Sequence, residues 1–114
     1  MKDLSLQSFE NSMIRTVWNE EEEEWYFSVV DVVGVLTESK DRNNYWKVLK
    51  NRLKKEGSQL VTNCNQLKMK SSDGKWYNTD CMNTEQLLRL IQSIPSKKAE
   101  PFKMQRKSIL LLQM

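Results

Sequence analysis

The sequence contains no histidine, which excludes Ser-His and Cys-His nucleophilic pairs, histidine acid–base chemistry and nearly all zinc sites. Its two cysteines, Cys64 and Cys81, are too few to build a four-ligand metal cluster by themselves. The three glycines, at positions 34, 57 and 74, form neither a phosphate-binding loop nor a dinucleotide-binding motif. From these absences we expect no metal, no cofactor and no enzyme activity.

Four aspartates are the remaining candidates for catalysis: Asp31, Asp41, Asp73 and Asp80. The first two fit helix starts and the third fits a turn. Asp80 lies beside Cys81, near the start of a predicted helix. No two of these carboxylates have a spacing that general acid–base or glycosidic chemistry needs, so no catalytic pair is predicted.

Long apolar runs are also lacking, since none reaches the roughly 18 residues that span a bilayer. The first four residues do not begin the apolar core of a signal peptide. We therefore expect a cytoplasmic protein with no membrane partner, in which both cysteines are reduced thiols. The chain does have 39% hydrophobic residues and four tryptophans in 114 residues, which predicts one domain with a modest core.

Charge is unevenly distributed along the chain. Glu20 to Glu24 form an acidic block. Between Lys40 and Lys70 there are nine basic and two acidic residues, a net charge of +7. This asymmetry is a candidate footprint for a polyanion, although a lysine-rich helix is also typical of a solvated face. The acidic block suits a charged loop that keeps a sheet edge soluble, and the alternative is a DNA mimic or docking patch.

A hairpin and a first helix are predicted in the N-terminal half. Strand propensity is high over Met13–Trp18 and Trp25–Phe27, and the glutamates between them suit a solvated tip. Ser28 is a good N-cap for the helix, with Asp31 completing a variant capping box. The apolar face of this helix then follows at helical spacing: Val29, Val32, Val33 and Leu36.

A second, basic helix is predicted from Arg42 to about Glu56, capped by Asp41 and ended by Gly57. Its helical spacing places one apolar face toward the core: Tyr45, Val48, Leu49 and Leu53. Trp46, Lys50 and Lys54 fall on a neighbouring face.

A second hairpin is predicted from Gln59–Lys70 and Lys75–Cys81, with Ser71 to Gly74 as the turn. That loop length places Lys70 opposite Lys75, Met69 beside Trp76 and Cys64 beside Cys81. A slip of one residue would undo this pairing. Of Trp76 and Tyr77, at least one is expected in the core. A redox role for the cysteines is left open.

Asn83 is predicted to cap a third helix, with Gln86 in the capping-box position and Pro95 at its end. Ser96 is predicted to cap a further short helix from Lys97 to about Lys107. The overall prediction is an α+β fold, with two β-hairpins or a small mixed sheet packed with three to four short α-helices.

Four blocks of the sequence resemble a known family. They are Trp25–Val32, Asn44–Trp46 running into Leu53–Lys54, Asp73–Lys75 with Asp80–Cys81, and Asn83 through Ser96. The resemblance is to the N-terminal domain of the BRO family, which includes prophage antirepressors and DNA-damage-inducible D-type proteins. It implies a nucleic-acid-linked regulatory module rather than an enzyme.

The resemblance covers residues 13–104 and leaves 1–12 as an N-terminal segment. We expect residues 105–114 to be an atypical end without the family's usual motif, and the family's second domain to be absent. A truncated gene, a shifted frame and a lineage-specific variant are the alternatives for this end. The apolar run Ile109 to Leu112 is expected to pack on the core or to mediate a homodimer, and a monomer fits equally well.

Two functions remain open on this basis. The first is DNA binding, to double or single strands, through the basic helix and second hairpin. Its proposed phosphate contacts are Lys47, Lys50, Arg52, Lys54, Lys55, Lys68, Lys70 and Lys75, and its base or packing contacts are Tyr45, Trp46 and Trp76. The alternative is an antirepressor-like module that binds a repressor or DNA-repair protein without contacting DNA.

Overall fold

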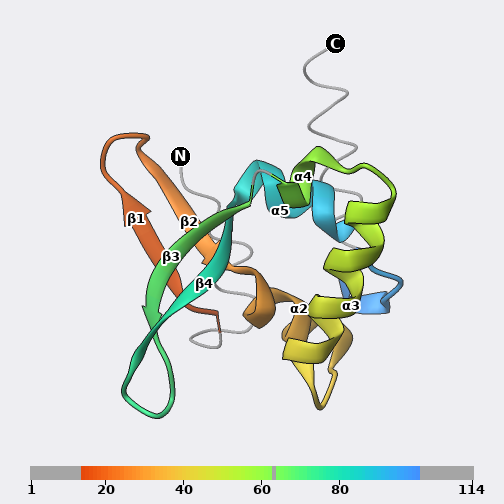
Figure 1. Cartoon of the computed structure of the whole chain (residues 1–114), viewed down its shortest axis with the longest axis horizontal. Coiled ribbons are helices and arrows are strands. Elements are labelled where there is room, and N and C mark those ends of the chain that lie inside the picture. Colours follow the sequence, from red (N-terminus) through yellow and green to blue (C-terminus); the bar gives the residue numbers. More distant parts are fainter. Residues whose placement is uncertain (1–13, 63, 101–114) are drawn as a thin grey trace.

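The computed structural model describes residues 14–62 and 64–100. Two β-hairpins join through their inner strands into one antiparallel sheet of order β1-β2-β4-β3, and helices pack beside it (Figure 1). The elements are β1 Thr16–Asn19, β2 Glu24–Ser28, α2 Val29–Thr37, α3 Arg42–Lys55, α4 Gln59–Thr62, β3 Asn65–Lys70, β4 Trp76–Asn83, α5 Thr84–Ile91 and the 3-10 turn η2 Lys97–Ala99. The predicted α+β class is confirmed, and every strand pair described is antiparallel.

The first hairpin forms with Glu20 to Glu23 at its tip, but β1 begins at Thr16, so the predicted strand over Ile14 and Arg15 is wrong. β1 and β2 pair from Thr16 with Phe27 to Asn19 with Glu24. The Asn19 side chain accepts a hydrogen bond from the Glu22 amide at 2.9 Å, and Glu23 adopts a left-handed φ of 52°. The glutamates therefore form an exposed turn, while the two strands carry aromatic side chains in the sheet.

Helix α2 begins directly after β2 because Ser28 caps it. The Ser28 hydroxyl accepts a hydrogen bond from the Asp31 amide, as predicted. The predicted capping box is wrong, because the Ser28 amide donates to the Arg15 carbonyl and the Asp31 carboxylate binds Arg15 instead. The three fully buried valines of α2 contact the central core, which compensates for the modest helix propensity of valine.

Helix α3 has the predicted bounds and N-cap, but its buried face differs from the prediction. Asp41 accepts from the Asn44 amide, and the helix ends before Gly57, whose φ is +78°. Trp46 is 6% exposed and belongs to the core, whereas Val48 is 60% exposed. The buried face is rotated toward the tryptophan because Trp46 contacts Asp80 of the sheet.

The second hairpin is shorter than predicted and has another register. Residues 59–62 form helix α4, so the predicted strand start at Gln59 is wrong. Lys70 pairs with Trp76 and Met69 with Tyr77, while Asn65 takes the position opposite Cys81 that was predicted for Cys64. The loop has five residues, Ser71 to Lys75, rather than four, and the added residue shifts every pair by one.

Helix α5 forms the predicted cap and apolar face, but it ends at Ile91, so the predicted end at Pro95 is wrong. Asn83 and Gln86 make a reciprocal capping box, and this helix contributes four buried residues to the core. Ser96 caps η2 as predicted. The predicted strand start at Met13, the end of the last helix and the apolar run 109–112 lie outside the described residues.

Candidate nucleic-acid interface

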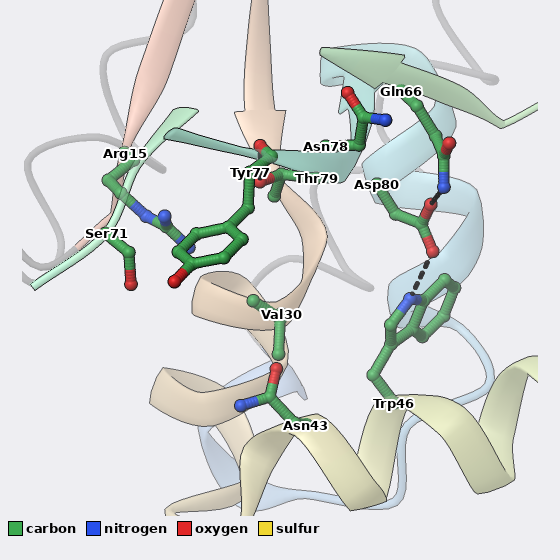
Figure 2. Close-up of a pocket in the computed structure, with 10 residues that line it drawn as sticks. All are labelled: Arg15, Val30, Asn43, Trp46, Gln66, Ser71, Tyr77, Asn78, Thr79 and Asp80. Atoms are coloured by element: carbon green, nitrogen blue, oxygen red, sulfur yellow. Dashed lines mark hydrogen bonds between the residues drawn. The ribbon is translucent and has the colours of Figure 1, made fainter. Parts of the chain in front are cut away.

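A cleft of about 310 Å³ opens between α3 and the β3–β4 hairpin. Strand β4 runs along one side, and the end of β2 with the first turns of α2 and α3 forms the other (Figure 2). Its lining is mostly polar and comes from six parts of the chain: Arg15, Val30, Asn43, Trp46, Gln66, Ser71, Tyr77, Asn78, Thr79 and Asp80. The cleft therefore depends on how helix and hairpin are fixed together.

Asp80 fixes the helix to the hairpin. Its carboxylate accepts hydrogen bonds from Trp46 Nε1 at 2.8 Å, Lys50 Nζ at 2.8 Å and Gln66 Nε2 at 2.9 Å (Figure 2 shows the first and third). Burial acts to raise the pKa of Asp80, but the hydrogen bonds from Lys50, Gln66 and Trp46 outweigh it and lower the pKa below its ordinary value. An ionised Asp80 thus sits at one end of the cleft.

The two flanks of α3 differ in what they face. One flank faces the hairpin. Its side chains are three or four positions apart in the sequence, as a helix with about 3.6 residues per turn requires: Asn43, Lys47, Lys50 and Lys54. The other flank carries Tyr45, Val48, Arg52 and Lys55. Arg52 Nη2 donates to the Ser93 carbonyl at 3.4 Å, after α5. Only the first flank shares a surface with the hairpin.

Hairpin residues that pair directly share one face of the sheet. Lys68 pairs with Asn78 and Lys70 with Trp76, on the same face as the Gln66–Asp80 pair. Because Asp80 contacts α3, this face looks toward the helix near its base. Lys68 and Lys70 therefore extend the basic flank of α3, whereas Lys75 lies in the exposed loop.

The aromatic candidates separate by exposure. Trp46 packs in the core with its indole N–H bound to Asp80, which favours the packing role for this residue. Trp76 and Tyr77 are 62% and 47% exposed, so the expectation that one of them is core is wrong. Both project from a part of β4 that lies beyond the helices. Tyr45 is half-buried against the core from the far flank of α3.

A second recess, of about 180 Å³, adjoins the cleft and shares Arg15 and Ser71 with it. Asp31 is 1% exposed in its wall and pairs with Arg15 Nε at 2.7 Å and with Arg42 Nη1 at 3.3 Å. Lys70 also lines this recess. We call it the arginine pocket.

Sequence reasoning explained Asp31 by the helix start alone and missed Arg15 and Arg42 as site residues. No local signal marks Arg15, because its contacts with Asp31 and the Lys70 carbonyl span 16 and 55 positions. Gln66 and Asn78 were missed for the same reason, since the register that brings them to the cleft was mispredicted by one residue.

The cysteines lie near each other without pairing as strand partners. Both are free thiols, and Cys64 Sγ lies 3.5 Å from the Cys81 carbonyl oxygen. Burial raises the pKa of each thiol to about 11. Both therefore stay protonated at neutral pH, which is unfavourable for thiolate chemistry.

Two further findings concern the described residues. Within residues 14–62 and 64–100, no three acidic or cysteine side chains gather where they would hold a metal ion. In the same part of the chain, no helix has the length and apolar character to cross a membrane.

The fold is a small α+β module in which a cleft opens between helix α3 and the β3–β4 hairpin. The family model described as the BRO family, N-terminal domain, matches residues 13–111. The chain therefore belongs to the BRO family, as the sequence blocks predicted, and it is a regulatory module of BRO type. The match begins where predicted and runs past residue 104. No curated protein and no solved structure matches the chain.

Proposed function

We propose that the chain is a DNA-binding regulatory module whose interface is the surface around the cleft. The observation that carries this proposal is the shared orientation of two basic elements. Lys47 and Lys54 lie on the flank of α3 that faces the hairpin, and Lys68 and Lys70 lie on the hairpin face that looks toward α3. Side chains that neutralise phosphates must lie on one surface to act together.

Lys50 has a different role in this surface. Its ammonium group binds Asp80, so part of its charge is already neutralised. Lys50 therefore holds the helix against the hairpin, and a phosphate must compete with Asp80 to reach it. The proposed interface relies on four lysines that form no ion pair within the described residues: Lys47, Lys54, Lys68 and Lys70.

The test compares two double variants on the same helix. Lys47→Ala with Lys54→Ala removes two charges from the flank facing the hairpin, and Arg52→Ala with Lys55→Ala removes two from the other flank. DNA affinity is measured by fluorescence anisotropy across a salt series. The first variant is expected to reduce the slope of log affinity against log salt by about 1.8, at about 0.9 per lost phosphate contact.

The matched variant on the far flank is expected to change that slope by less than about 0.5. Equal loss from both variants would contradict the orientation of the interface. Absence of binding by the folded wild type at low salt would reject DNA as the ligand.

A second candidate function rests on the far flank of α3. There, a hollow of about 350 Å³ is lined by Tyr45, Val48, Leu49 and Arg52, with Val48 60% exposed. An exposed apolar side chain beside an aromatic and an arginine suits a protein contact. If the chain acts on a repressor or repair protein, Val48→Asp abolishes that complex, and the complex shows little salt dependence.

A further inference from the structure

The cleft is electrically polarised along its length. At one end Arg15, Ser71 and Tyr77 lie together, and at the other the Asp80 carboxylate lies with Trp46 and Gln66 (Figure 2). A phosphate is attracted to the arginine end, whereas at the other end the charge of Asp80 is paired with Lys50 Nζ at 2.8 Å. An amino group that donates hydrogen bonds is favoured at the carboxylate end, because a carboxylate only accepts.

The arginine pocket continues the cleft at its cationic end. Three cationic side chains line it with one carboxylate: Arg15, Arg42 and Lys70 against Asp31. Asp31 orients both guanidinium groups, and the hydroxyl-bearing Ser71 and Ser72 complete the rim. Oriented arginines beside a lysine and hydroxyl groups are the donors that recognise a phosphate.

Between the two ends lie groups suited to a nucleobase. The Asn43 side-chain amide lines the cleft and makes no hydrogen bond within the described residues, whereas the Asn78 side chain points to the other side of β4 from Tyr77 (Figure 2). Amides of this kind can donate to and accept from a base edge. The Tyr77 ring is half-exposed, and its hydroxyl donates to Asp73 Oδ2 at 2.6 Å, which restrains the ring. An exposed, restrained ring is a stacking surface that any base can use.

We propose that the cleft and the arginine pocket together bind one unstacked nucleotide of a single DNA strand, with its phosphate at Arg15, Arg42 and Lys70 and its base between Tyr77 and Asp80. This assignment rests on the proposed DNA-binding function. It adds that the bound DNA is single-stranded. A base inside a duplex is stacked on both faces and cannot enter such a recess, whereas a base of a single strand is free to do so.

The polarity also predicts which bases are preferred. A carboxylate accepts from the exocyclic amino group of cytosine, whereas thymine presents a carbonyl oxygen at the equivalent position. Asp80 is already bonded to Gln66 and Trp46, which hold its oxygens in place. Strands of cytosine are therefore expected to bind more tightly than strands of thymine.

The test uses the full chain and four labelled DNAs of equal length: a cytosine strand, a thymine strand, a strand of abasic residues and a blunt duplex. Anisotropy at one salt concentration compares ligands with the same number of phosphates per strand. The cytosine strand is expected to bind at least about fivefold more tightly than the abasic strand, because base contacts are lost from the latter.

Two variants locate the effect. Asn43→Ala is expected to weaken binding of the cytosine strand and to leave the abasic strand unchanged, since it removes a base contact. Arg42→Ala is expected to weaken both strands. Arg89→Ala on α5 removes the same charge from an exposed position outside the site and serves as the control. Circular dichroism and urea titration establish that each variant is folded.

Each outcome bears on a different claim. Equal affinity for the cytosine and abasic strands, or tighter binding of the duplex than of either, would overturn the nucleotide site and leave the DNA-binding function standing. Binding of none of the four DNAs would overturn both. If free deoxycytidine monophosphate shifts the Trp46 indole N–H resonance while no strand binds, the assignment to DNA is wrong.

Discussion

The two hairpins have similar local construction but different relations to the core. In the first, β2 packs against helices α2 and α5, with Phe27 1% exposed. In the second, β3 and β4 extend beyond the helices, so that Lys68, Lys70 and Trp76 are exposed, and Met69 is buried in a small cluster with Tyr26 of the first hairpin (Figure 1). Their tips carry opposite charge, glutamates on the first and lysines around the second.

This difference shows how one motif serves two purposes in a small domain. The first hairpin contributes aromatic side chains to the core, including Trp25 and Phe27. Its acidic tip is an exposed turn. This agrees with the interpretation that the glutamates keep the edge of the sheet soluble. The second hairpin uses its base for attachment, through Met82 and Asp80, and leaves its outer half available as a binding surface.

The largest expected effect is on the free energy of unfolding, and it tests whether the first hairpin contributes more to the core than the second. Phe27→Ala should lower the free energy of unfolding by about 3–4 kcal/mol, because it removes a fully buried aromatic ring and leaves a cavity. Trp76→Ala should lower it by less than about 0.5 kcal/mol, because that ring is mostly exposed. Urea denaturation measures both, and similar losses would contradict the division.

The next effect concerns the attachment of the second hairpin. Asp80→Asn should lower the free energy of unfolding by about 1–2 kcal/mol, since the charged partner of Lys50 is lost at a partly exposed site. The pKa of Asp80 is lowered in the folded state, so its contribution is complete above the ordinary carboxylate pKa and is lost as pH falls through the lower folded value.

The stability difference between wild type and this variant should therefore shrink as pH falls below about 4. Urea denaturation at a series of pH values measures it. A difference that stays constant down to low pH would show that the ionised form of Asp80 does not stabilise the fold.

A third prediction compares the removal of two charges from each hairpin. Lys68→Ala with Lys70→Ala should weaken DNA binding about tenfold or more at low salt, because two phosphate contacts are lost from the hairpin face. Glu20→Gln with Glu21→Gln, at the exposed tip of the first hairpin, should change affinity less than about twofold. Comparable changes from both pairs would mean that net charge, not placement, governs binding.

The smallest effect concerns the two turns. Gly74 has a φ of +85° and Glu23 a φ of 52°, so a glycine and a glutamate adopt the same left-handed region. Gly74→Ala should destabilise by about 1 kcal/mol, and Glu23→Gly should stabilise by up to about 1 kcal/mol. No atom lies within 4 Å of a Cβ added at Gly74, so the expected loss is conformational rather than steric. Thermal unfolding of both variants checks the opposite signs.

Local sequence patterns predicted the helix starts well. Ser28, Asp41 and Asn83 cap the helices as expected, because capping depends on a side chain and an amide only three residues away. The family blocks also identified the BRO domain correctly. Interactions that span a few residues are encoded where they occur, and a single sequence suffices to find them.

Errors arose where a choice depended on distant residues. Helical spacing allowed either Val48 or Trp46 on the buried face of α3, and Asp80, 34 positions from Trp46, selected the tryptophan. An alternation of apolar and polar residues could not distinguish a four-residue from a five-residue loop in the second hairpin. Both Trp76 and Tyr77 are exposed because no helix covers that end of the sheet.

The sequence by itself determined the helix caps, the charge of each hairpin and the family, since these depend on nearest neighbours and on composition. Only the tertiary structure decided that the lysines divide between two flanks of α3, that Arg15, Asn43 and Asp80 line one cleft, and that Arg42 lines the adjoining arginine pocket. The reason is physical: a cleft forms from side chains brought together by packing and strand register, and both are settled by contacts between residues far apart in the chain.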